Sequence, residues 1–267
     1  MFKTLTIAGS DTSGGAGLQA DLKTFQEFGV YGMNATTMIV AENPDTNWSH
    51  DIYPLALNVI EAQIETVLAG IGVDALKTGM LGSSEVIELV AKKLDHYKVK
   101  QVVIDPVMVC KGTDEVLQPE AARSIKELLA PRATVITPNV FEASQLSGIS
   151  IKSVDDMKNA ALKIHGLGAK NVLIKGGAKL GTAKAIDILY DGQEFFTFEA
   201  AKLDTDCTHG AGCTYSAAVT AGLAKGVALP AAVKQAKDFV LQGIKNGIPL
   251  NSYVGATCHA AHRLYSK

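Results

Sequence analysis

The sequence predicts an α/β protein, built as a three-layer α/β/α sandwich around a mostly parallel central sheet. Short apolar runs rich in β-branched residues alternate with amphipathic stretches of helix length along the 267 residues. Strands that are joined through helices pair in parallel with right-handed crossovers. Hydrophobic residues make up 47% of the chain and charged residues 19%, a balance typical of a protein that buries a large core.

Five runs are predicted to be strands buried on both faces, because each is continuously apolar and ends in polar or glycine-rich residues. They cover residues 4–11, 75–80, 102–107, 134–139 and 171–177. Amphipathic periodicity predicts helices between them. Examples are residues 16–28, 85–97, 119–129 and 155–166. Ser153 is the expected N-cap of the last helix, because its hydroxyl can accept from a free first-turn N–H group.

Residues 185–200 depart from this alternation. There Asp191-Gly192 separates two extended runs and predicts a β-hairpin. From Gly210 almost to the end the pattern predicts helices, through 217–226 and 231–247. No linker or internal repeat divides the chain, so we expect a single domain over residues 1–267, with a small lid. Residues 34–53 and 108–117 are expected to form edge or lid elements rather than core.

Composition excludes several classes of protein. A net charge of −2 offers no general attraction to nucleic acid or to an anionic membrane. No apolar run reaches the roughly 20 residues of a membrane helix, and the first residues lack a signal-peptide pattern. The four cysteines, Cys110, Cys207, Cys213 and Cys258, are too scattered for a disulfide scaffold. We therefore expect a cytoplasmic protein with no nucleic-acid or membrane partner.

Polar side chains stand at the predicted strand ends, where open parallel sheets collect ligands. These residues are Asp11, Lys77, Asp105, Asn139 and Lys175. A carboxylate, an amide and lysines at one sheet edge predict a highly charged ligand held with a metal ion. The alternative for each residue alone is that it caps a helix or satisfies a loop.

Two glycine-rich turns predict anion binding. Residues 14–17 join the first strand to the first helix, and Gly210-Ala211-Gly212 leads from His209 into Cys213. Glycines can turn successive N–H groups into one hollow, and a following helix adds its free N-terminal donors. Such donors stabilise a phosphoryl group in transfer. The alternatives are a flexible turn at 14–17 and close helix packing at the second turn. The P-loop, dinucleotide-binding, nucleophile-elbow and HExxH zinc motifs are absent.

Several motifs carry a resemblance that spans nearly the whole chain. They are "AGSDTSGGAGLQADLKTF", "KTGML", "VVIDPVM", "ITPNVFEASQLSG", "VLIKGG" and "THGAGCTYSAA". Together they resemble the ribokinase superfamily, and within it the kinases of hydroxymethylpyrimidine and a similar bacterial branch of pyridoxal kinases. The resemblance implies a three-layer α/β fold with a small lid, Mg²⁺-ATP as the phosphoryl donor, and a homodimer.

The resemblance also implies a catalytic role for Cys213. Most ribokinase-like enzymes have at this position an aspartate that takes the proton from the substrate hydroxyl, whereas the pyrimidine and pyridoxal branch has a cysteine. A thiol at a helix N-terminus is expected to have a lowered pKa, which suits a thiolate base. The alternative is a small cysteine of the core. Gly210, Ala211 and Gly212 are expected to supply backbone donors beside it.

Other roles follow from matching positions. Asn139 and Glu142 resemble the N-x-x-E element that orders Mg²⁺, with Glu142 acting through water, and Asp105 faces the same metal region. Lys175 and Gly212 are expected to contact the ATP phosphates. The vitamin ring is expected to contact residues that the families share, or that stand near them: Asp21, Glu42, His50, Gly79, Met80 and Val107. For Met80 the alternative is ordinary core packing.

Two features favour a B6 vitamer over the pyrimidine. Cys110 lies in the predicted lid, where many pyrimidine kinases have no cysteine. Its thiolate can add to the aldehyde of pyridoxal as a hemithioacetal, whereas hydroxymethylpyrimidine has no aldehyde. Glu42 replaces a glutamine that is frequent in pyrimidine kinases, and the segment containing His50 resembles the pyridoxal branch. The sequence therefore favours pyridoxal kinase, with hydroxymethylpyrimidine/phosphomethylpyrimidine kinase as the alternative or as a second activity. A non-catalytic binding protein is disfavoured because the Lys175, Asn139/Glu142 and glycine-turn motifs are all present.

Overall fold

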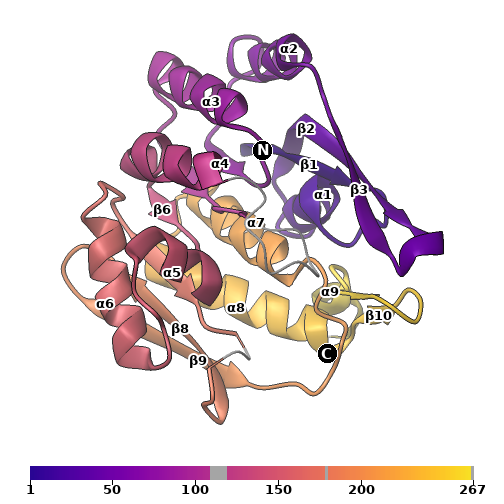
Figure 1. Ribbon diagram of the computed structural model, residues 1–267, viewed down its shortest axis with the longest axis vertical. Coiled ribbons are helices and arrows are strands. Elements are labelled where there is room, and N and C mark those ends of the chain that lie inside the picture. Colours follow the sequence, from indigo (N-terminus) through magenta and orange to yellow (C-terminus); the bar gives the residue numbers. More distant parts are fainter. Residues whose placement is uncertain (109–118, 178–179, 266–267) are drawn as a thin grey trace.

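The structure is a computed structural model that describes residues 1–108, 119–177 and 180–265. The strands are β1 (Lys3–Asp11), β2 (Tyr31–Asn43), β3 (Ser49–Pro54), β4 (Ala75–Thr78), β5 (Val102–Ile104), β6 (Val135–Ile136), β7 (Val172–Lys175), β8 (Lys184–Tyr190), β9 (Phe195–Ala201), β10 (Ile248–Pro249) and β11 (Gly255–Ala256). The α-helices are α1 (Gly17–Glu27), α2 (Leu57–Leu68), α3 (Ser84–Tyr97), α4 (Pro119–Ser124), α5 (Val140–Ser147), α6 (Val154–His165), α7 (Ala211–Ala224), α8 (Leu229–Lys245) and α9 (Ala261–Tyr265). Figure 1 shows their arrangement.

Nine strands form the central sheet in the order β3-β2-β1-β4-β5-β6-β7-β8-β9. The strands from β2 through β1, β4, β5 and β6 to β7 are parallel, and β3, β8 and β9 are antiparallel to their neighbours. The predicted mostly parallel sheet and the β8–β9 hairpin are thus confirmed. Because the strands from β2 to β7 run in the same direction, their carboxyl ends lie along one rim of the sheet.

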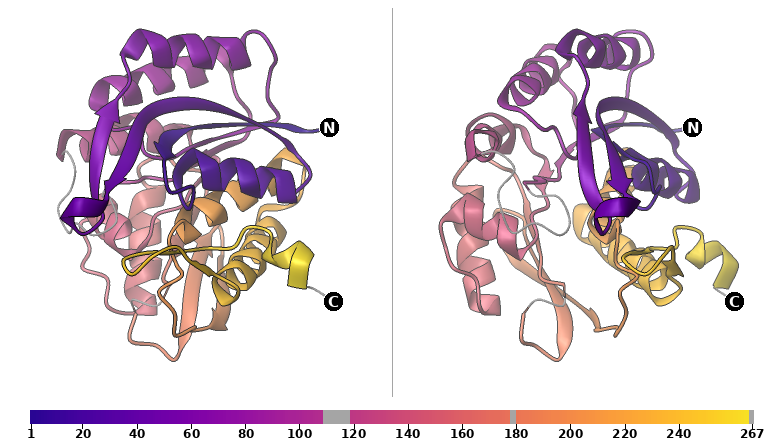
Figure 2. Two further views of the ribbon diagram at one scale, coloured as in Figure 1. Left: turned by 90° about the vertical axis from the view of Figure 1, so that its right-hand side faces the viewer. Right: turned by 45° about the vertical axis from the view of Figure 1, so that its right-hand side comes forward.

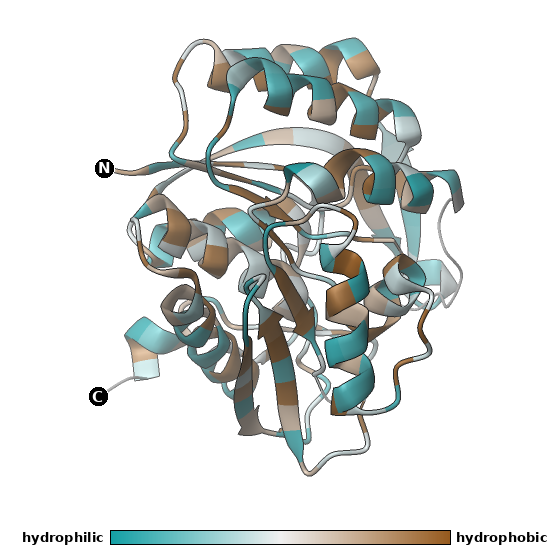
Figure 3. Ribbon diagram, turned by 90° about the vertical axis from the view of Figure 1, so that its left-hand side faces the viewer, coloured by the Kyte–Doolittle hydropathy of each residue, from teal (hydrophilic) through white to brown (hydrophobic). Residues whose placement is uncertain are grey.

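Helices cover both faces of this sheet. Helices α1, α7 and α8 pack on one face and α2 to α6 on the other, as the views in Figures 1 and 2 show. The central strands are buried on both sides: in β5, Val102 and Ile104 join one core cluster and Val103, between them, joins the other. Figure 3 shows the hydrophobic strands as brown segments between helices with teal outer residues. This is the predicted three-layer sandwich.

Helix starts follow local sequence rules. Ser153 caps α6 as predicted, because its side chain accepts from the N–H group of Asp156. The helix predicted at 119–129 is α4 followed by a π-helical turn over Ile125–Leu129. The segment 34–53 forms the β2–β3 hairpin at the sheet edge, but Ala35, Met38 and Val40 are buried, so this segment is not purely peripheral. Of the second predicted lid element, 109–117 lies outside the described residues.

The prediction of helix almost to the C-terminus is wrong after Lys245. Residues 248–256 form the antiparallel β10–β11 ribbon, because Gly247 and Pro249 interrupt the helical pattern. The ribbon supports the loop before α7: the His209 N–H group donates to the Gly255 carbonyl at 3.0 Å, and the Thr257 N–H group donates to the His209 carbonyl at 3.0 Å. The end of the chain therefore helps to position the second glycine turn.

Candidate active site

A cavity of about 860 Å³ opens at the carboxyl ends of the parallel strands. The five polar residues that the sequence placed at strand ends all line it: Asp11, Lys77, Asp105, Asn139 and Lys175. They come from five different parallel strands or the residues that follow them, which explains why residues far apart in sequence meet here. The expectation that these side chains converge is therefore met.

The glycine turn before α7 faces this cavity. Gly210 is the N-cap of α7 with φ +80°, a left-handed conformation that favours glycine. The Ala211 N–H group donates to the Thr208 carbonyl at 3.1 Å, so Ala211 is not the anion donor that the sequence predicted. The next N–H groups, of Gly212 and Cys213, belong to the first helical turn, where helices lack internal partners. Lys175 stands beside them, because a Cβ at Gly212 would lie 3.7 Å from its Nζ.

The two glycine turns of the sequence are in contact. A Cβ built on Gly210 would lie 1.8 Å from the Gly15 carbonyl oxygen, and one on Gly15 would lie 2.5 Å from His209 Cδ2. The backbone N–H group of Gly17, at the start of α1, donates to the Cys213 sulfur. The sequence predicted two separate turns, whereas in the structure the two turns pack together and form one surface.

Replacing Gly210 by alanine is expected to destabilise the protein by roughly 2–4 kcal/mol, because the substitution combines a left-handed φ with a clash against fixed backbone. Thermal and urea unfolding measure this loss. Gly226→Ala, at the other end of α7, is the matched control: its φ is +75° but nothing lies within 4 Å of the added Cβ. That control should cost only about 1 kcal/mol. Equal losses in the two variants would contradict the contact between the turns.

Cys213 lines the cavity and is half-buried, but its expected low pKa is wrong. Burial raises the pKa of the Cys213 thiol to about 11, and the nearby charges of Asp21 and Asp105 act in the same direction. The positive charge of Lys77 and the Gly17 N–H group lower the pKa only in part. The helix terminus does not overcome the loss of water around the sulfur, so the resting side chain is a thiol.

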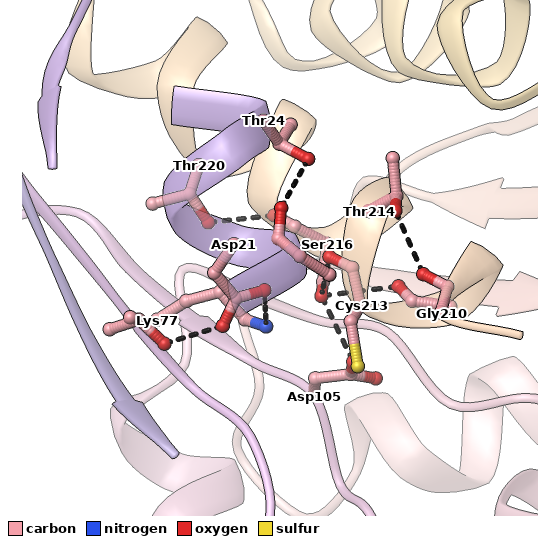
Figure 4. Close-up of polar contacts among 12 residues, drawn as sticks. Asp21, Thr24, Lys77, Asp105, Gly210, Cys213, Thr214, Ser216 and Thr220 are labelled. Atoms are coloured by element: carbon pink, nitrogen blue, oxygen red, sulfur yellow. Dashed lines mark hydrogen bonds and ion pairs between the residues drawn. The ribbon is translucent and has the colours of Figure 1, made fainter. Parts of the chain in front are cut away.

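Lys77 and Asp21 form a fully buried ion pair beneath the cavity floor. Lys77 Nζ lies 2.7 Å from Asp21 Oδ1, and both side chains are 0% exposed. The Thr6 hydroxyl donates to Asp21 Oδ2 at 2.6 Å. Figure 4 shows the pair beside Cys213 and Asp105. Asp21 does border the cavity, but both of its oxygens already have protein partners, so we assign it to holding Lys77 rather than to contacting a vitamin.

Asp105 orients two side chains of the site. Lys175 Nζ donates to its Oδ1 at 2.8 Å, and the Ser216 hydroxyl donates to its Oδ2 at 2.9 Å. Burial by itself lowers the pKa of Lys175, but the charges of Asp105 and Glu142 raise it overall, so the lysine is a fixed cation. Because both Asp105 oxygens are engaged, direct metal ligation by this residue would require it to release a partner.

Asn139 and Glu142 form a capping box at the start of α5. The Asn139 side chain accepts from the Glu142 N–H group at 2.9 Å, and Glu142 accepts from the Asn139 N–H group at 2.8 Å. Both residues also line the cavity, and Glu142 is buried. The helix-capping alternative is therefore realised, and it leaves a carboxylate, a hard oxygen donor of the kind Mg²⁺ prefers, at the cavity wall.

The residues expected to contact the vitamin line the same cavity. Glu42 and His50 come from paired positions of β2 and β3, and the turn after β4 brings Gly79 and Met80. Val107 follows β5 and also lines the cavity. Cys110 lies outside the described residues.

Sequence reasoning missed three other residues that line the cavity, namely Asp187, Tyr215 and Lys237. Asp187 of β8 accepts from the Gly176 N–H group at 3.0 Å, from the Tyr215 hydroxyl at 3.0 Å and from Lys237 Nζ at 2.6 Å. All three side chains are buried. A sequence signal existed, because Lys237 falls on the apolar stripe of α8 between Val233 and Val240, where a charged residue requires a buried partner.

The fold and the site together define a class of protein. A mostly parallel α/β/α sandwich whose rim carries a glycine turn at a helix N-terminus, beside a fixed lysine, is a ribokinase-like phosphotransferase. The sequence profile of phosphomethylpyrimidine kinases matches residues 11–258. The chain belongs to this family.

Similar proteins include kinases of both vitamins. A pyridoxine kinase of Bacillus subtilis (strain 168) is 59% identical over 265 residues, 99% of this chain and 98% of the relative. A hydroxymethylpyrimidine/phosphomethylpyrimidine kinase of the same organism is 44% identical over 98% of this chain and 96% of the relative. The ADP complex of Bacillus subtilis pyridoxal kinase superposes with a TM-score of 0.96, covering 99% of both chains. Pyridoxal kinase from Staphylococcus aureus with AMP-PCP and pyridoxal is 48% identical and has a TM-score of 0.94, covering 99% of this chain and 96% of the other. These likenesses confirm the expected fold and family.

Across the described residues, the longest apolar helices fall short of what is needed to span a bilayer.

Proposed function

We propose that this protein is an ATP-dependent kinase that phosphorylates the hydroxymethyl group of a B6 vitamer, namely pyridoxal, pyridoxine or pyridoxamine, to give the 5′-phosphate. The observation that carries the proposal is the meeting of the Gly210 turn, Lys175 and Cys213 with Glu42 and His50 around one cavity. The Gly210 turn, Lys175 and Cys213 suit a phosphoryl group in transfer. Glu42 and His50 suit a polar ring. The likeness to pyridoxine and pyridoxal kinases supports the same substrate class.

In the proposed reaction the alcohol oxygen of the vitamin forms a bond to the γ-phosphorus. The bond from that phosphorus to the bridging oxygen breaks, and ADP leaves. The N–H groups of Gly212 and Cys213, together with Lys175, stabilise the negative charge on the moving group. Cys213 takes the hydroxyl proton. Because the resting side chain is a thiol with a pKa of about 11, it must first lose its own proton, and only a minority of molecules is ready at neutral pH.

Mg²⁺ is proposed to accompany ATP, where it neutralises phosphate charge. The donor set fits this ion, since Glu142 and Asp105 are buried carboxylates at the cavity wall. The Asp105 oxygens already accept from Lys175 and Ser216. We therefore propose that both carboxylates would hold the ion through water. A covalent role for Cys110 is a further proposal: its thiol would anchor the pyridoxal aldehyde as a hemithioacetal while Cys213 acts on the alcohol.

The second candidate function is phosphorylation of hydroxymethylpyrimidine and its phosphate. It is favoured by the family profile that matches the chain and by the 44% identical relative. Both substrates are flat aromatic rings that carry a primary alcohol, so one cavity can accept either. We also propose a single domain, a homodimer and a cytoplasmic location, as the family resemblance implies.

Turnover of pyridoxal, pyridoxine, hydroxymethylpyrimidine and hydroxymethylpyrimidine phosphate with Mg²⁺-ATP tests these proposals. We expect the highest kcat/KM with a B6 vitamer. We expect Cys110→Ala to reduce turnover of pyridoxal more than that of pyridoxine, because only pyridoxal has an aldehyde. An equal loss of turnover with both vitamers would rule out a covalent bond between Cys110 and pyridoxal. Higher kcat/KM with the pyrimidines would replace the first function with the second.

A further inference from the structure

Three titratable side chains meet at the wall of the cavity. They are Asp11 at the end of β1, Glu42 in β2 and His209 in the loop before α7, and one ligand atom of each lies within 4.8 Å of the others. The reaction proposed above uses neither Asp11 nor His209. His50 of β3 is paired in register with Glu42 and lines the same cavity, so it is the fourth titratable group on this side.

Asp11 is the ionised member of the cluster. Its Oδ1 accepts from the Ser13 N–H group at 2.9 Å and from the Ser13 hydroxyl at 2.7 Å. Its Oδ2 accepts from the Ala16 N–H group at 2.5 Å and lies 2.8 Å from His209 Nε2. Burial alone would raise the pKa of Asp11, but the hydrogen bonds from His209 and other groups lower it well below its usual range. Four donors thus fix a negative charge at this position.

Glu42 faces that charge. The ionised Asp11 opposes ionisation of a second carboxyl group this close, so Glu42 keeps its proton to a higher pH than an isolated carboxyl group would. Burial, and then the hydrogen bond and charge of Asp11, raise the pKa of Glu42 to about 7.

We infer that Asp11 and His209 are positioning residues that make Glu42 the proton-bearing member of a carboxyl pair, and that vitamin binding requires this neutral Glu42. The inference rests on the proposed function, since it deepens the recognition of the vitamin. B6 vitamers carry an acidic phenol on the ring, and its phenolate is repelled when Glu42 ionises beside Asp11. His209 keeps the proton on Glu42, because its hydrogen bond makes Asp11 the stronger acid.

The proton is tested without any substrate. In the full chain labelled with ¹³C at the carboxyl carbons of Asp and Glu, we expect one glutamate signal to titrate near pH 7 and to vanish in Glu42→Gln. In His209→Leu the same titration should also move an aspartate signal, because the proton is then shared. If no glutamate signal titrates above pH 6 in the unaltered protein, the inference is overturned. This result is independent of kinase activity, so it separates failure of the inference from failure of the proposed function.

The consequence is tested with pyridoxine as substrate. We expect KM for pyridoxine to rise about tenfold between pH 6 and pH 8 as Glu42 loses its proton. In Glu42→Gln, which imitates the neutral acid, the rise should disappear while KM for ATP stays unchanged. Glu199→Gln, an exposed position on β9, is the matched control and should keep the original profile. An unchanged pH profile in Glu42→Gln would overturn the role of this proton in binding.

Discussion

Replacing Cys213 by alanine is expected to lower kcat by about 10²- to 10⁴-fold, the range typical of a lost acid–base group, while KM for ATP stays nearly constant. The sulfur lies at the start of α7, next to the backbone N–H groups that we propose to bind the phosphoryl group. Removing the sulfur leaves the backbone of the glycine turn in place. Steady-state kinetics with a B6 vitamer measures the loss. Calorimetric titration with AMP-PCP shows whether nucleotide binding is retained.

The pH profile supplies an independent check on this role. At pH values below a pKa of about 11, the ionised fraction of the thiol rises about tenfold for each unit by which the pH increases. A plot of log kcat against pH, measured at saturating vitamer, should therefore rise with a slope near 1 between pH 7 and pH 9 in the unaltered enzyme, and the slope should vanish in Cys213→Ala. Cys207→Ala, which changes a cysteine that does not line the cavity, is the matched control. Near-normal turnover in Cys213→Ala would show that the Cys213 sulfur is not the general base.

Replacing Lys77 by methionine is expected to destabilise the fold by about 3–5 kcal/mol, because it leaves the Asp21 charge buried without its partner. Both members of the pair are fully buried, and burial already raises the pKa of Asp21 despite Lys77. Without the lysine, the pKa of Asp21 should rise further. A carboxyl whose pKa is raised by folding binds more protons in the folded state, so stability falls as pH increases above its ordinary pKa. The loss should therefore be larger at pH 8 than at pH 5.

Urea unfolding at the two pH values measures this effect. Lys234→Met removes a lysine from an exposed ion pair with Asp238 and should change stability by less than about 1 kcal/mol. The double variant Lys77→Met with Asp21→Asn should recover part of the stability, because no unpaired charge remains and Asn can still accept from Thr6. If Lys77→Met alone were as stable as Lys234→Met, the Lys77–Asp21 pair would contribute little to the stability of the fold.

Motif chemistry located most of the site because the strand ends of a parallel sheet lie at one rim. Asp105, Lys175 and the Gly210 turn could be placed there from their position after apolar runs. The sequence did not indicate which partners each side chain would choose. Asp21 was expected at the ring but holds Lys77, and Ala211 was expected to bind the anion but donates to Thr208.

Asp187 and Lys237 were missed for a related reason. Lys237 stands out as a charged residue on the apolar stripe of α8, but its partner Asp187 lies in β8, and the two meet only because β8 and α8 pack against the same cavity. The C-terminal ribbon was missed although Gly247 and Pro249 interrupt the helical pattern, and its contact with His209 joins residues more than 40 positions apart in the chain. Local periodicity does not contain such long-range pairings.

The sequence by itself determined the layered α/β fold, the order of its main strands and helices, and the family, because periodicity, glycine turns and motif order are local properties. Only the tertiary structure decided the protonation of the site. Burial of the Cys213 sulfur raises its pKa where the helix terminus alone would lower it, and burial together with the nearby Asp11 raises the pKa of Glu42 to about 7. Both effects depend on how much water and which charges surround a group, and these are fixed only when distant segments pack together.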